Sequence, residues 1–212
     1  MSNQSNSKPR TFPYKNLIIE LHPEVYDPAE DSFLLLESLH INPGDAVLEL
    51  GTGCGLIALA CALKGAEVLC TDINPFAVQL TRRNKDRNVH HLIGAVEIRQ
   101  GDLFSVLKKK ELFDLIICNP PYLPTKATER TGGWFDIATD GGHDGLEVTK
   151  RFLEGVSAHL LPKGSAYFVF SSLSNQFILK QYLKKQRLFS CIVACHQFEG
   201  EELNVYRVSP TA

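Results

Sequence analysis

The 212-residue sequence has no apolar run near the roughly 20 residues that a membrane-spanning helix requires. It also has no marked excess of charge, since 22 Lys and Arg residues oppose 24 Asp and Glu residues. A general nucleic-acid-binding protein normally carries a strong basic excess, so this class is disfavoured, although a small local basic patch is still compatible. The amino terminus, MSNQSNSKPRTF, is polar and lacks the apolar stretch of a signal peptide. We therefore expect residues 1–12 to form a flexible tail and the protein to be cytoplasmic.

Metal-binding spacings are also missing. The six cysteines include no Cys-x-x-Cys pair, and the seven histidines include no His-Glu-x-x-His arrangement. We therefore expect reduced, mostly buried thiols and no metal site. Cys191 and Cys195 are spaced as CIVAC, so on a strand they are expected to share one face.

What is present is the composition of an ordinary globular domain, with 44% hydrophobic, 9% aromatic and 22% charged residues. The chain shows no repeat, low-complexity tract or linker, so we predict a single domain over residues 13–212. From residue 46 onward, short apolar runs rich in Val, Ile and Leu alternate with amphipathic stretches. This alternation is typical of a sheet that helices cover on both faces.

The predicted strands are residues 46–50, 67–71, 96–99, 113–118, 166–170, 189–195 and 204–208, and the predicted helices are 55–64, 75–86, 145–161 and 175–186. Alternating strands and helices imply right-handed crossovers. We therefore predict an α/β fold with a seven-stranded, mostly parallel, doubly wound sheet. The last two strands are joined only by residues around 199–202, which is too short for a crossover helix, so an antiparallel strand is expected at one edge.

Two helix starts carry local signals. Asn74 followed by Pro75 predicts a helix N-cap and a proline in the first turn. Asp144 followed by Glu147 predicts a capping box that opens the next long helix.

The segment ELGTGCG (residues 49–55) joins the first predicted strand to a helix. Glycines there allow sharp turns and let a ligand approach the backbone closely, and ligands bind at this end of an open parallel sheet. The spacing differs from the dinucleotide fingerprint, because position 56 is Leu, and from a P-loop, because no Gly-Lys-Ser/Thr follows. A ligand without a pyrophosphate is therefore favoured, and an NAD-dependent dehydrogenase is disfavoured.

Three successive strands each end in or just before a carboxylate, namely Glu49, Asp72 and Asp102. Glu49 can pair with the ammonium group of an amino acid, and Asp72 stands where a carboxylate can hold ribose hydroxyls. Asp102 can accept a hydrogen bond from an adenine amino group while Leu103 or Phe104 covers the ring. The ordered set predicts an adenosine ligand with an amino-acid tail, although each residue alone could equally be a turn or packing residue.

The fourth strand ends in Asn119-Pro120-Pro121-Tyr122. The prolines fix φ and remove two backbone donors. The Asn119 side-chain oxygen and the Pro120 carbonyl can then accept both hydrogens of one planar NH₂ group, on which Tyr122 can stack. Such a site selects a primary amide or an exocyclic base amine. Positioning and electrostatics would direct this nitrogen at an electrophilic methyl group, and a strong general base is not required because the proton is lost afterwards.

The ordered motifs ELGTGCG, TDINP, GDLF and NPPY resemble those of class I S-adenosylmethionine-dependent methyltransferases, which have a Rossmann-like fold. More narrowly, VYDPAEDSFLLLESL (residues 25–39) and GGHDGLEVTKRFL (residues 141–153) resemble the HemK-like glutamine methyltransferases. The resemblance covers residues 26–208 and is nearest to the short archaeal and eukaryotic branch. It implies methylation of the side-chain amide of the glutamine in the Gly-Gly-Gln motif of a class I translation release factor.

The resemblance also implies a role for each motif residue. The implied cofactor contacts are Glu49, Gly51 and Gly53 for the methionine part, Asp72 for the ribose, Asp102 and Leu103 for the adenine, and Asp31 and Ser32 as a cover from the N-terminal side. Asn119 would lie beside the cofactor and orient the glutamine amide. Pro120, Pro121 and Tyr122 would complete the catalytic site.

Relatives in this family commonly pair with a small zinc-binding activator that extends the sheet at the third strand. In this sequence that strand is 96–99, a predicted edge with unpaired backbone groups. The resemblance therefore implies an activator subunit at this edge, and whether the chain requires one stays open.

Three other functions are compatible with parts of the pattern. The first is methylation of exocyclic amino groups of adenine or guanine in DNA or RNA, which NPPY would serve equally well and for which the clusters at 82–87 and 108–110 could supply basic residues. The second is protein lysine methylation, although a planar amide suits the motif better than a flexible ammonium. The third is a non-catalytic cofactor-binding subunit, which the intact Asn119 and loop glycines disfavour.

Overall fold

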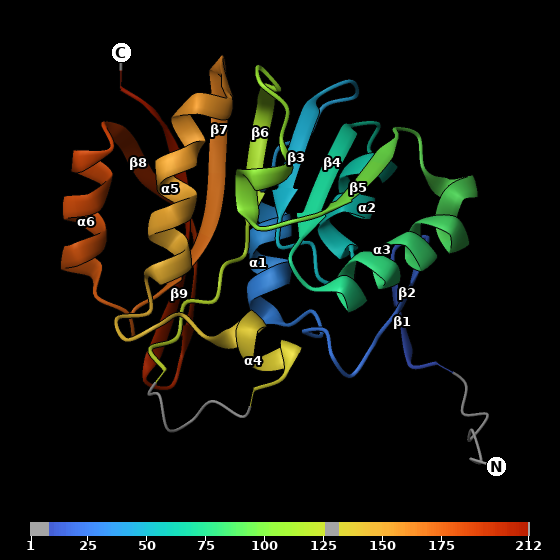
Figure 1. Cartoon of the computed structure of the whole chain (residues 1–212), viewed down its shortest axis with the longest axis horizontal. Helices are drawn as coiled ribbons and strands as arrows, with labels where there is room; N and C mark the ends of the chain where they lie inside the picture. Colours follow the sequence, from blue (N-terminus) through green and yellow to red (C-terminus); the bar gives the residue numbers. More distant parts are fainter. Residues whose placement is uncertain (1–8, 126–131, 212) are drawn as a thin grey trace.

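The computed structural model describes residues 9–125 and 132–211, and its centre is a seven-stranded sheet in the order β5-β4-β3-β6-β7-β9-β8. The strands of this sheet are β3 Ala46–Leu50, β4 Glu67–Asp72, β5 Val96–Gln100, β6 Phe113–Cys118, β7 Leu160–Ser171, β8 Leu188–Phe198 and β9 Glu201–Pro210. Strands β3 to β7 run parallel to their sheet neighbours among themselves. The predicted α/β fold with a mostly parallel sheet is confirmed (Figure 1).

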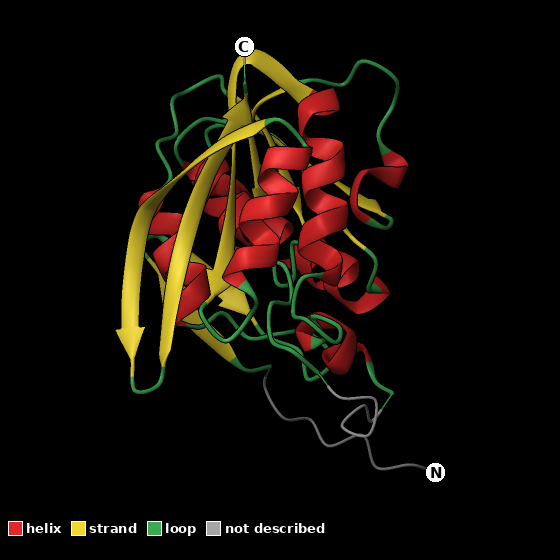
Figure 2. Cartoon of the chain, turned by 90° about the vertical axis from the view of Figure 1, so that its left-hand side faces the viewer, coloured by secondary structure: helices red, strands yellow, loops and turns green. Residues whose placement is uncertain are grey.

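The carboxy-terminal hairpin completes the sheet. Strand β9 pairs antiparallel with both β7 and β8, so the antiparallel strand lies one position inside the edge and β8 forms the edge itself. Figure 2 shows the two strands side by side on the left, joined at their lower end by a short turn. The predicted antiparallel pairing of the last two strands is confirmed, and both strands are longer than the sequence pattern indicated.

Helices cover both faces of the sheet. On one face, α1 Glu30–Ser38, α2 Leu56–Leu63 and α3 Pro75–Asn88 bury their apolar side chains in one core cluster. On the other face, α5 Glu147–His159 and α6 Gln176–Lys185 pack with the short 3₁₀ helix η2 Leu103–Val106 in a second cluster. A 3₁₀ turn η1 Val89–His91 extends α3, and the short helix α4 Trp134–Thr139 lies below the sheet in Figure 1. The doubly wound arrangement therefore places every loop that follows a parallel strand at one end of the molecule.

A small amino-terminal hairpin, β1 Thr11–Tyr14 and β2 Leu17–Glu20, precedes α1. Residues 11 and 12 thus belong to a strand, so the predicted end of the tail at residue 12 is wrong, while residues 1–8 lie outside the described residues. The hairpin is anchored on α1, because Phe12 packs edge-on against Phe33 with ring centroids 6.3 Å apart.

Two asparagines of α3 hold the hairpin in place. Asn88 accepts from the Ile18 N–H at 2.8 Å and donates to the Ile18 carbonyl at 2.9 Å. Asn84 accepts from the Glu20 N–H at 2.8 Å and donates to the Glu20 carbonyl at 3.0 Å. Asn84 also donates to the Cys54 carbonyl at 2.8 Å. The side-chain amides of one helix therefore take the place of a third strand and tie the hairpin to the glycine loop.

Local details confirm one predicted helix start and correct the other. Asn74 caps α3 by accepting from the Phe76 N–H at 2.9 Å, with Pro75 in the first turn. The capping box predicted at Asp144 is wrong, because α5 begins at Glu147 after an uncapped Leu146. Asp144 instead accepts from the Leu146 N–H at 3.0 Å and pairs with Lys150.

The cysteines are all free thiols, four of them buried. The prediction that Cys191 and Cys195 share a face is wrong, because strand β8 contains a bulge between Ile192 and Ala194. Their partners on β9 are Arg207 and Asn204, which are three residues apart, so the two thiols point to opposite faces. Among residues 9–125 and 132–211, no helix combines the length and apolar character required to cross a bilayer.

Candidate active site

A cavity of about 210 Å³ opens at the carboxyl ends of β3, β4 and β6. All of the residues that the motifs predicted for the site line this cavity, except Asp31 and Tyr122. The predicted residues that line it are Ser32, Glu49, Gly51, Gly53, Asp72, Asp102, Leu103, Asn119, Pro120 and Pro121. Segments far apart in the sequence therefore meet at one point of the fold, as the strand order requires.

The glycine loop forms the floor of the cavity. Gly51 and Gly53 have φ angles of +76° and +58°, which side chains with a Cβ rarely adopt. A Cβ added to Gly51 would meet no atom within 4 Å, so it would project into open space where a ligand can approach. The N–H groups of Gly51 and Thr52 both donate to the Thr71 carbonyl, at 2.9 and 3.0 Å, which fixes the turn against β4.

Glu49 is buried at the start of this loop, with 3% of its surface exposed. Its Oε2 atom accepts hydrogen bonds from the Thr52 hydroxyl at 2.7 Å and from the Ala58 N–H at 3.1 Å. Burial nevertheless raises the pKa of Glu49 to about 8, because these two hydrogen bonds offset only part of the cost of desolvating the charged carboxylate. A cationic ligand group in the cavity would favour the charged form.

Asp72 joins the glycine loop to the start of α3. One carboxylate oxygen accepts from the Gly53 N–H and the other from the Asn74 N–H, both at 2.9 Å. Burial raises the pKa of this carboxyl, and the backbone hydrogen bonds act in the opposite direction. Each oxygen keeps a further lone pair, so the carboxylate can also accept from a pair of ligand hydroxyls.

Asp102 lies at the more exposed side of the cavity. Its side chain caps η2 in a capping box with Ser105, and its Oδ2 atom pairs with the Arg151 guanidinium at 2.5 Å. Leu103, the next residue, has a φ of +46°, which is strained for a side chain with a Cβ. Leu103 lines the cavity wall despite this strain, and its side chain can cover a flat ring there.

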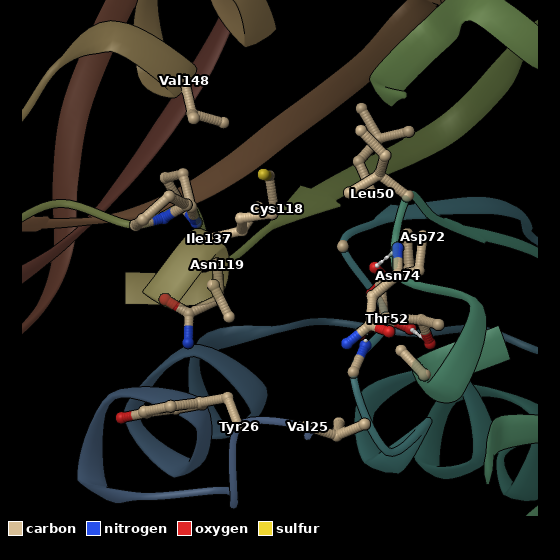
Figure 3. A pocket seen from close by; sticks show the side chains of 18 of the residues that line it. Val25, Tyr26, Leu50, Thr52, Asp72, Asn74, Cys118, Asn119, Ile137 and Val148 are labelled. Carbon is tan, nitrogen blue, oxygen red and sulfur yellow. Dashed lines mark hydrogen bonds between the residues drawn. The ribbon is translucent and has the colours of Figure 1, made fainter. Parts of the chain in front are cut away.

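Asn119 lies in the opposite wall, at the end of β6. Its Nδ2 donates to Asp31 Oδ2 at 3.0 Å and is 3.5 Å from the Ser32 hydroxyl. Its other side-chain atom, Oδ1, is buried and has no hydrogen-bond partner within the described part of the chain. Figure 3 shows Asn119 and Tyr26 on one side of the cavity, across from Thr52 and Asp72 on the other.

Two tyrosines, Tyr122 and Tyr26, lie near Asn119, and of these only Tyr26 lines the cavity. The Tyr122 hydroxyl donates to Asp31 Oδ2 at 3.1 Å, and its ring is not part of the cavity wall, so the geometry does not support the predicted stacking on a flat substrate group. Tyr26 lines the cavity instead and donates to the same oxygen at 3.3 Å. Burial and the Asp31 carboxylate raise the pKa of both tyrosines, so both hydroxyls stay protonated and donate.

Several cavity residues were not predicted from the sequence. Those on the segment before α1, on α4 and on α5 are Val25, Tyr26, Pro28, Trp134, Ile137, Ala138, Val148 and Arg151. Trp134 is the only tryptophan of the chain, which is a weak signal for a site. Most of the others, namely Val25, Tyr26, Pro28, Val148 and Arg151, lie inside the segments 25–39 and 141–153, whose resemblance to a known family assigned no role to these five residues. Among residues 9–125 and 132–211, no group of three or more His, Cys, Asp or Glu side chains is arranged to hold a metal ion.

Comparison with known proteins agrees with this geometry. Residues 24–135, just over half of the chain, match the family model described as the methyltransferase small domain. A putative protein N5-glutamine methyltransferase of Methanocaldococcus jannaschii is 43% identical over 74% of this chain and 78% of its own length. Methyltransferase HEMK2 of Mus musculus is 33% identical over 88% of this chain and 90% of its own length.

Among solved structures, the E. cuniculi Mtq2–Trm112 complex, described as responsible for the methylation of the eRF1 translation termination factor, is similar. It superposes with a TM-score of 0.68 at 22% identity, covering 89% of this chain and 99% of the matched chain. At that identity the likeness shows the fold alone. The family match and the two relatives go further: the chain belongs to the methyltransferase small domain family, as its motifs indicated.

Proposed function

We propose that this chain transfers a methyl group from S-adenosylmethionine to the side-chain amide nitrogen of the glutamine in the Gly-Gly-Gln motif of a class I release factor. The observation that carries the proposal is the state of Asn119. Its amide nitrogen is already bonded to Asp31, whereas its oxygen is buried without a partner among the described residues. A buried acceptor left unpaired costs roughly 1–3 kcal/mol. A substrate NH₂ group would supply the missing donor.

The cavity fits the cofactor on the opposite wall. The open space above Gly51 admits a ligand beside the loop backbone. The buried carboxyl of Glu49 can become charged against an ammonium group, and Asp72 can accept from ribose hydroxyls. Leu103 and Asp102 would hold the adenine. When bound there, S-adenosylmethionine supplies an electrophilic methyl group on a sulfonium.

The protein's own part in the reaction is to hold the amide nitrogen. The Asn119 oxygen accepts one N–H of the substrate, and the Pro120 carbonyl can accept the other. Because Pro120 and Pro121 have no N–H, no backbone donor at these two positions competes with the substrate. Both acceptors stabilise the positive charge that develops as the nitrogen lone pair localises, and the surplus proton leaves afterwards.

The charges at the cavity favour a protein substrate over a nucleic acid. The segment EVYDPAED (residues 24–31), which borders the cavity, carries four carboxylates and no basic residue; Asp27 pairs with Arg10 and Asp31 is buried, so Glu24 and Glu30 carry the negative charge of this segment toward solvent. A phosphate backbone would be repelled there. The basic cluster on α3 is partly neutralised, since Arg83 and Arg87 both pair with Glu20, at 3.0 and 3.1 Å.

We also propose that a small zinc-binding activator pairs with the edge strand β5, in the cytoplasm where translation terminates. Strand β5 is an edge of the sheet, as the sequence predicted, and can accept another strand. The similar Mtq2–Trm112 structure is a complex with a partner subunit. Full cofactor affinity and good solubility of the chain purified alone would count against the need for an activator.

The deciding experiment is a transfer assay with methyl-labelled cofactor, run with and without an activator subunit. The substrates are a release factor, the same factor with Gln replaced by Glu in the Gly-Gly-Gln motif, duplex DNA and tRNA. We expect label only on the factor that retains the glutamine. Label on DNA or tRNA alone would overturn the proposal in favour of an exocyclic-amine methyltransferase. Equal label on both release factors would indicate another side chain, such as lysine.

A further inference from the structure

We propose that Asp31 is a positioning residue that acts through Asn119. Its carboxylate fixes which end of the Asn119 amide is available to the substrate, and so makes the site select a group that donates hydrogen bonds. The inference rests on the proposed function for the identity of the substrate. It differs from the cofactor-covering role that the motif resemblance implied for this residue.

The position of Asp31 argues against direct contact with the cofactor. It lies in the first turn of α1 with 3% of its surface exposed, and it is not among the residues that line the cavity. Ser32, its neighbour, does line the cavity. Asp31 therefore stands behind Asn119 as seen from the cavity.

The contacts of Asp31 converge on one oxygen atom. Oδ2 accepts from Asn119 Nδ2 at 3.0 Å, from the Tyr122 hydroxyl at 3.1 Å and from the Tyr26 hydroxyl at 3.3 Å. Oδ1 accepts from the backbone N–H of Ser32 at 2.6 Å and from its hydroxyl at 3.1 Å. The carboxylate is thus held from both sides and cannot turn away from Asn119 without breaking several hydrogen bonds.

This arrangement determines the orientation of the Asn119 amide. The two ends of an amide are nearly equal in size, so shape alone does not distinguish them, and the hydrogen-bond partners decide. An ionised carboxylate only accepts hydrogen bonds. The opposite orientation would place two oxygens in contact at about the 3.0 Å now spanned by a hydrogen bond. The Asn119 nitrogen must face Asp31, and the oxygen is left as the acceptor without a partner among the described residues.

Replacement of the carboxylate by an amide removes this selection. In Asp31→Asn, the new side chain can donate to the Asn119 oxygen, so the Asn119 nitrogen would face the substrate NH₂ group and repel it. We expect kcat to fall by about 10–100-fold. The Kd for S-adenosylhomocysteine should stay within about threefold of wild type, because Asp31 does not reach the cavity.

The orientation itself is measured without turnover, from the side-chain amide signals of the ¹⁵N-labelled enzyme. The Asn119 signal is identified by its absence in Asn119→Asp. In the wild type we expect one amide proton to be shifted downfield and to exchange slowly, since it is bonded to a carboxylate. This signature should disappear in Asp31→Asn and persist in Tyr122→Phe, the matched control that removes one donor to the same oxygen but keeps the carboxylate.

The outcomes separate the two proposals. A wild-type protein that shows the Asn119 amide signature but does not methylate a release factor would overturn the proposed function, and the positioning role of Asp31 would still hold. An unperturbed Asn119 signal in the wild type, or an unchanged signal in Asp31→Asn, would overturn the positioning role. A tenfold or larger rise in Kd in Asp31→Asn with kcat unchanged would restore the cofactor-contact role. If Asp31→Asn does not fold, the positioning role is still tested by the Asn119 amide signal. A downfield, slowly exchanging proton in the wild type and in Tyr122→Phe supports the role, and its absence from the wild type overturns it.

Discussion

The two walls of the cavity differ in how far their polar atoms are already paired inside the protein. On the glycine-loop wall, the carboxyl groups of Glu49 and Asp72 each accept two hydrogen bonds from the chain. On the facing wall, Asn119 uses its nitrogen toward Asp31, and its oxygen has no partner in the part of the chain described. The first wall is therefore held in shape by the protein, whereas the second is completed by its ligand.

The largest effect is expected on the second wall. Asn119→Ala removes the unpaired acceptor, so kcat should fall about 100-fold or more while the Kd for S-adenosylhomocysteine stays close to wild type. Steady-state kinetics with a release factor and calorimetry with the cofactor product measure the two quantities. A comparable loss in both would mean that the two walls do not act separately.

A smaller effect is expected on the first wall. Asp72→Ala removes a ligand acceptor and also frees the N–H groups of Gly53 and Asn74, so the Kd for S-adenosylhomocysteine should rise about 10–100-fold. Asp72→Asn keeps the size of the side chain and one acceptor oxygen, so its Kd for S-adenosylhomocysteine should lie between those of Asp72→Ala and the wild type. Normal affinity in the Ala variant, measured by calorimetry, would refute the ribose-binding role.

The first wall should also respond to pH through Glu49, whose pKa is raised to about 8 by burial. Below that pH the carboxyl of the free protein is protonated, and an ammonium group in the cavity would drive the proton off. Affinity for S-adenosylhomocysteine should therefore rise by roughly tenfold per pH unit, at most, between about pH 6 and 7 and level off above 8. Calorimetry in two buffers of different ionisation enthalpy should show up to one proton released.

Glu49→Gln is the control, and its affinity should vary little with pH over this range. The same shift has a consequence for stability, because the folded pKa lies above the unfolded one. The stabilisation that protonated Glu49 gives the folded state is fully present below about pH 4.5 and is lost as the pH rises through about 8. As the pH rises over this range, the free energy of unfolding of the ligand-free wild type should therefore fall relative to that of Glu49→Gln. The absence of proton release in the wild type would show that Glu49 does not meet a cation.

The smallest effect is expected where the first wall is exposed to solvent. Asp102 and Arg151 are 41% and 48% exposed, so their ion pair is well screened. Arg151→Ala should raise the Kd for S-adenosylhomocysteine by no more than about threefold, and less at high salt. Lys150→Ala, which breaks a pair with Asp144 instead, is the matched control. A tenfold loss in Arg151→Ala alone would indicate that the guanidinium contacts the cofactor.

The sequence predicted the parts of the fold whose pattern is set by local chemistry. Strands β3 and β6 match their predicted bounds, because a strand buried on both faces is mostly apolar, and each of these two has a single charged residue, Glu49 or Asp114. The loop residues of the first wall were predicted because glycines and carboxylates occur together at successive strand ends mainly where a ligand binds. The position of Asn119 followed from the two prolines after it.

Other features depend on contacts that no local pattern records. The β1–β2 hairpin has only four residues in each strand and is stabilised by Asn84 and Asn88, which look like ordinary polar positions of a helix. The bulge in β8 separates Cys191 from Cys195 and leaves no mark in the sequence CIVAC. The contact between Asp31 and Asn119 could be found only from the fold, because the two residues are 88 positions apart in the sequence.

Because Asn84 and Asn88 bind the hairpin to α3, residues 9–20 belong structurally to the part of the protein that forms the glycine-loop wall, although none of them lines the cavity. A shortened chain that began after Glu20 would remove the backbone partners of Asn84 and Asn88, together with the buried side chains of Leu17 and Ile19 that pack in the same core cluster as α2 and α3. Asn84 also supports the loop at Cys54. Removing these residues to improve crystals or expression would therefore lower the affinity for S-adenosylmethionine, although none of them contacts the cavity.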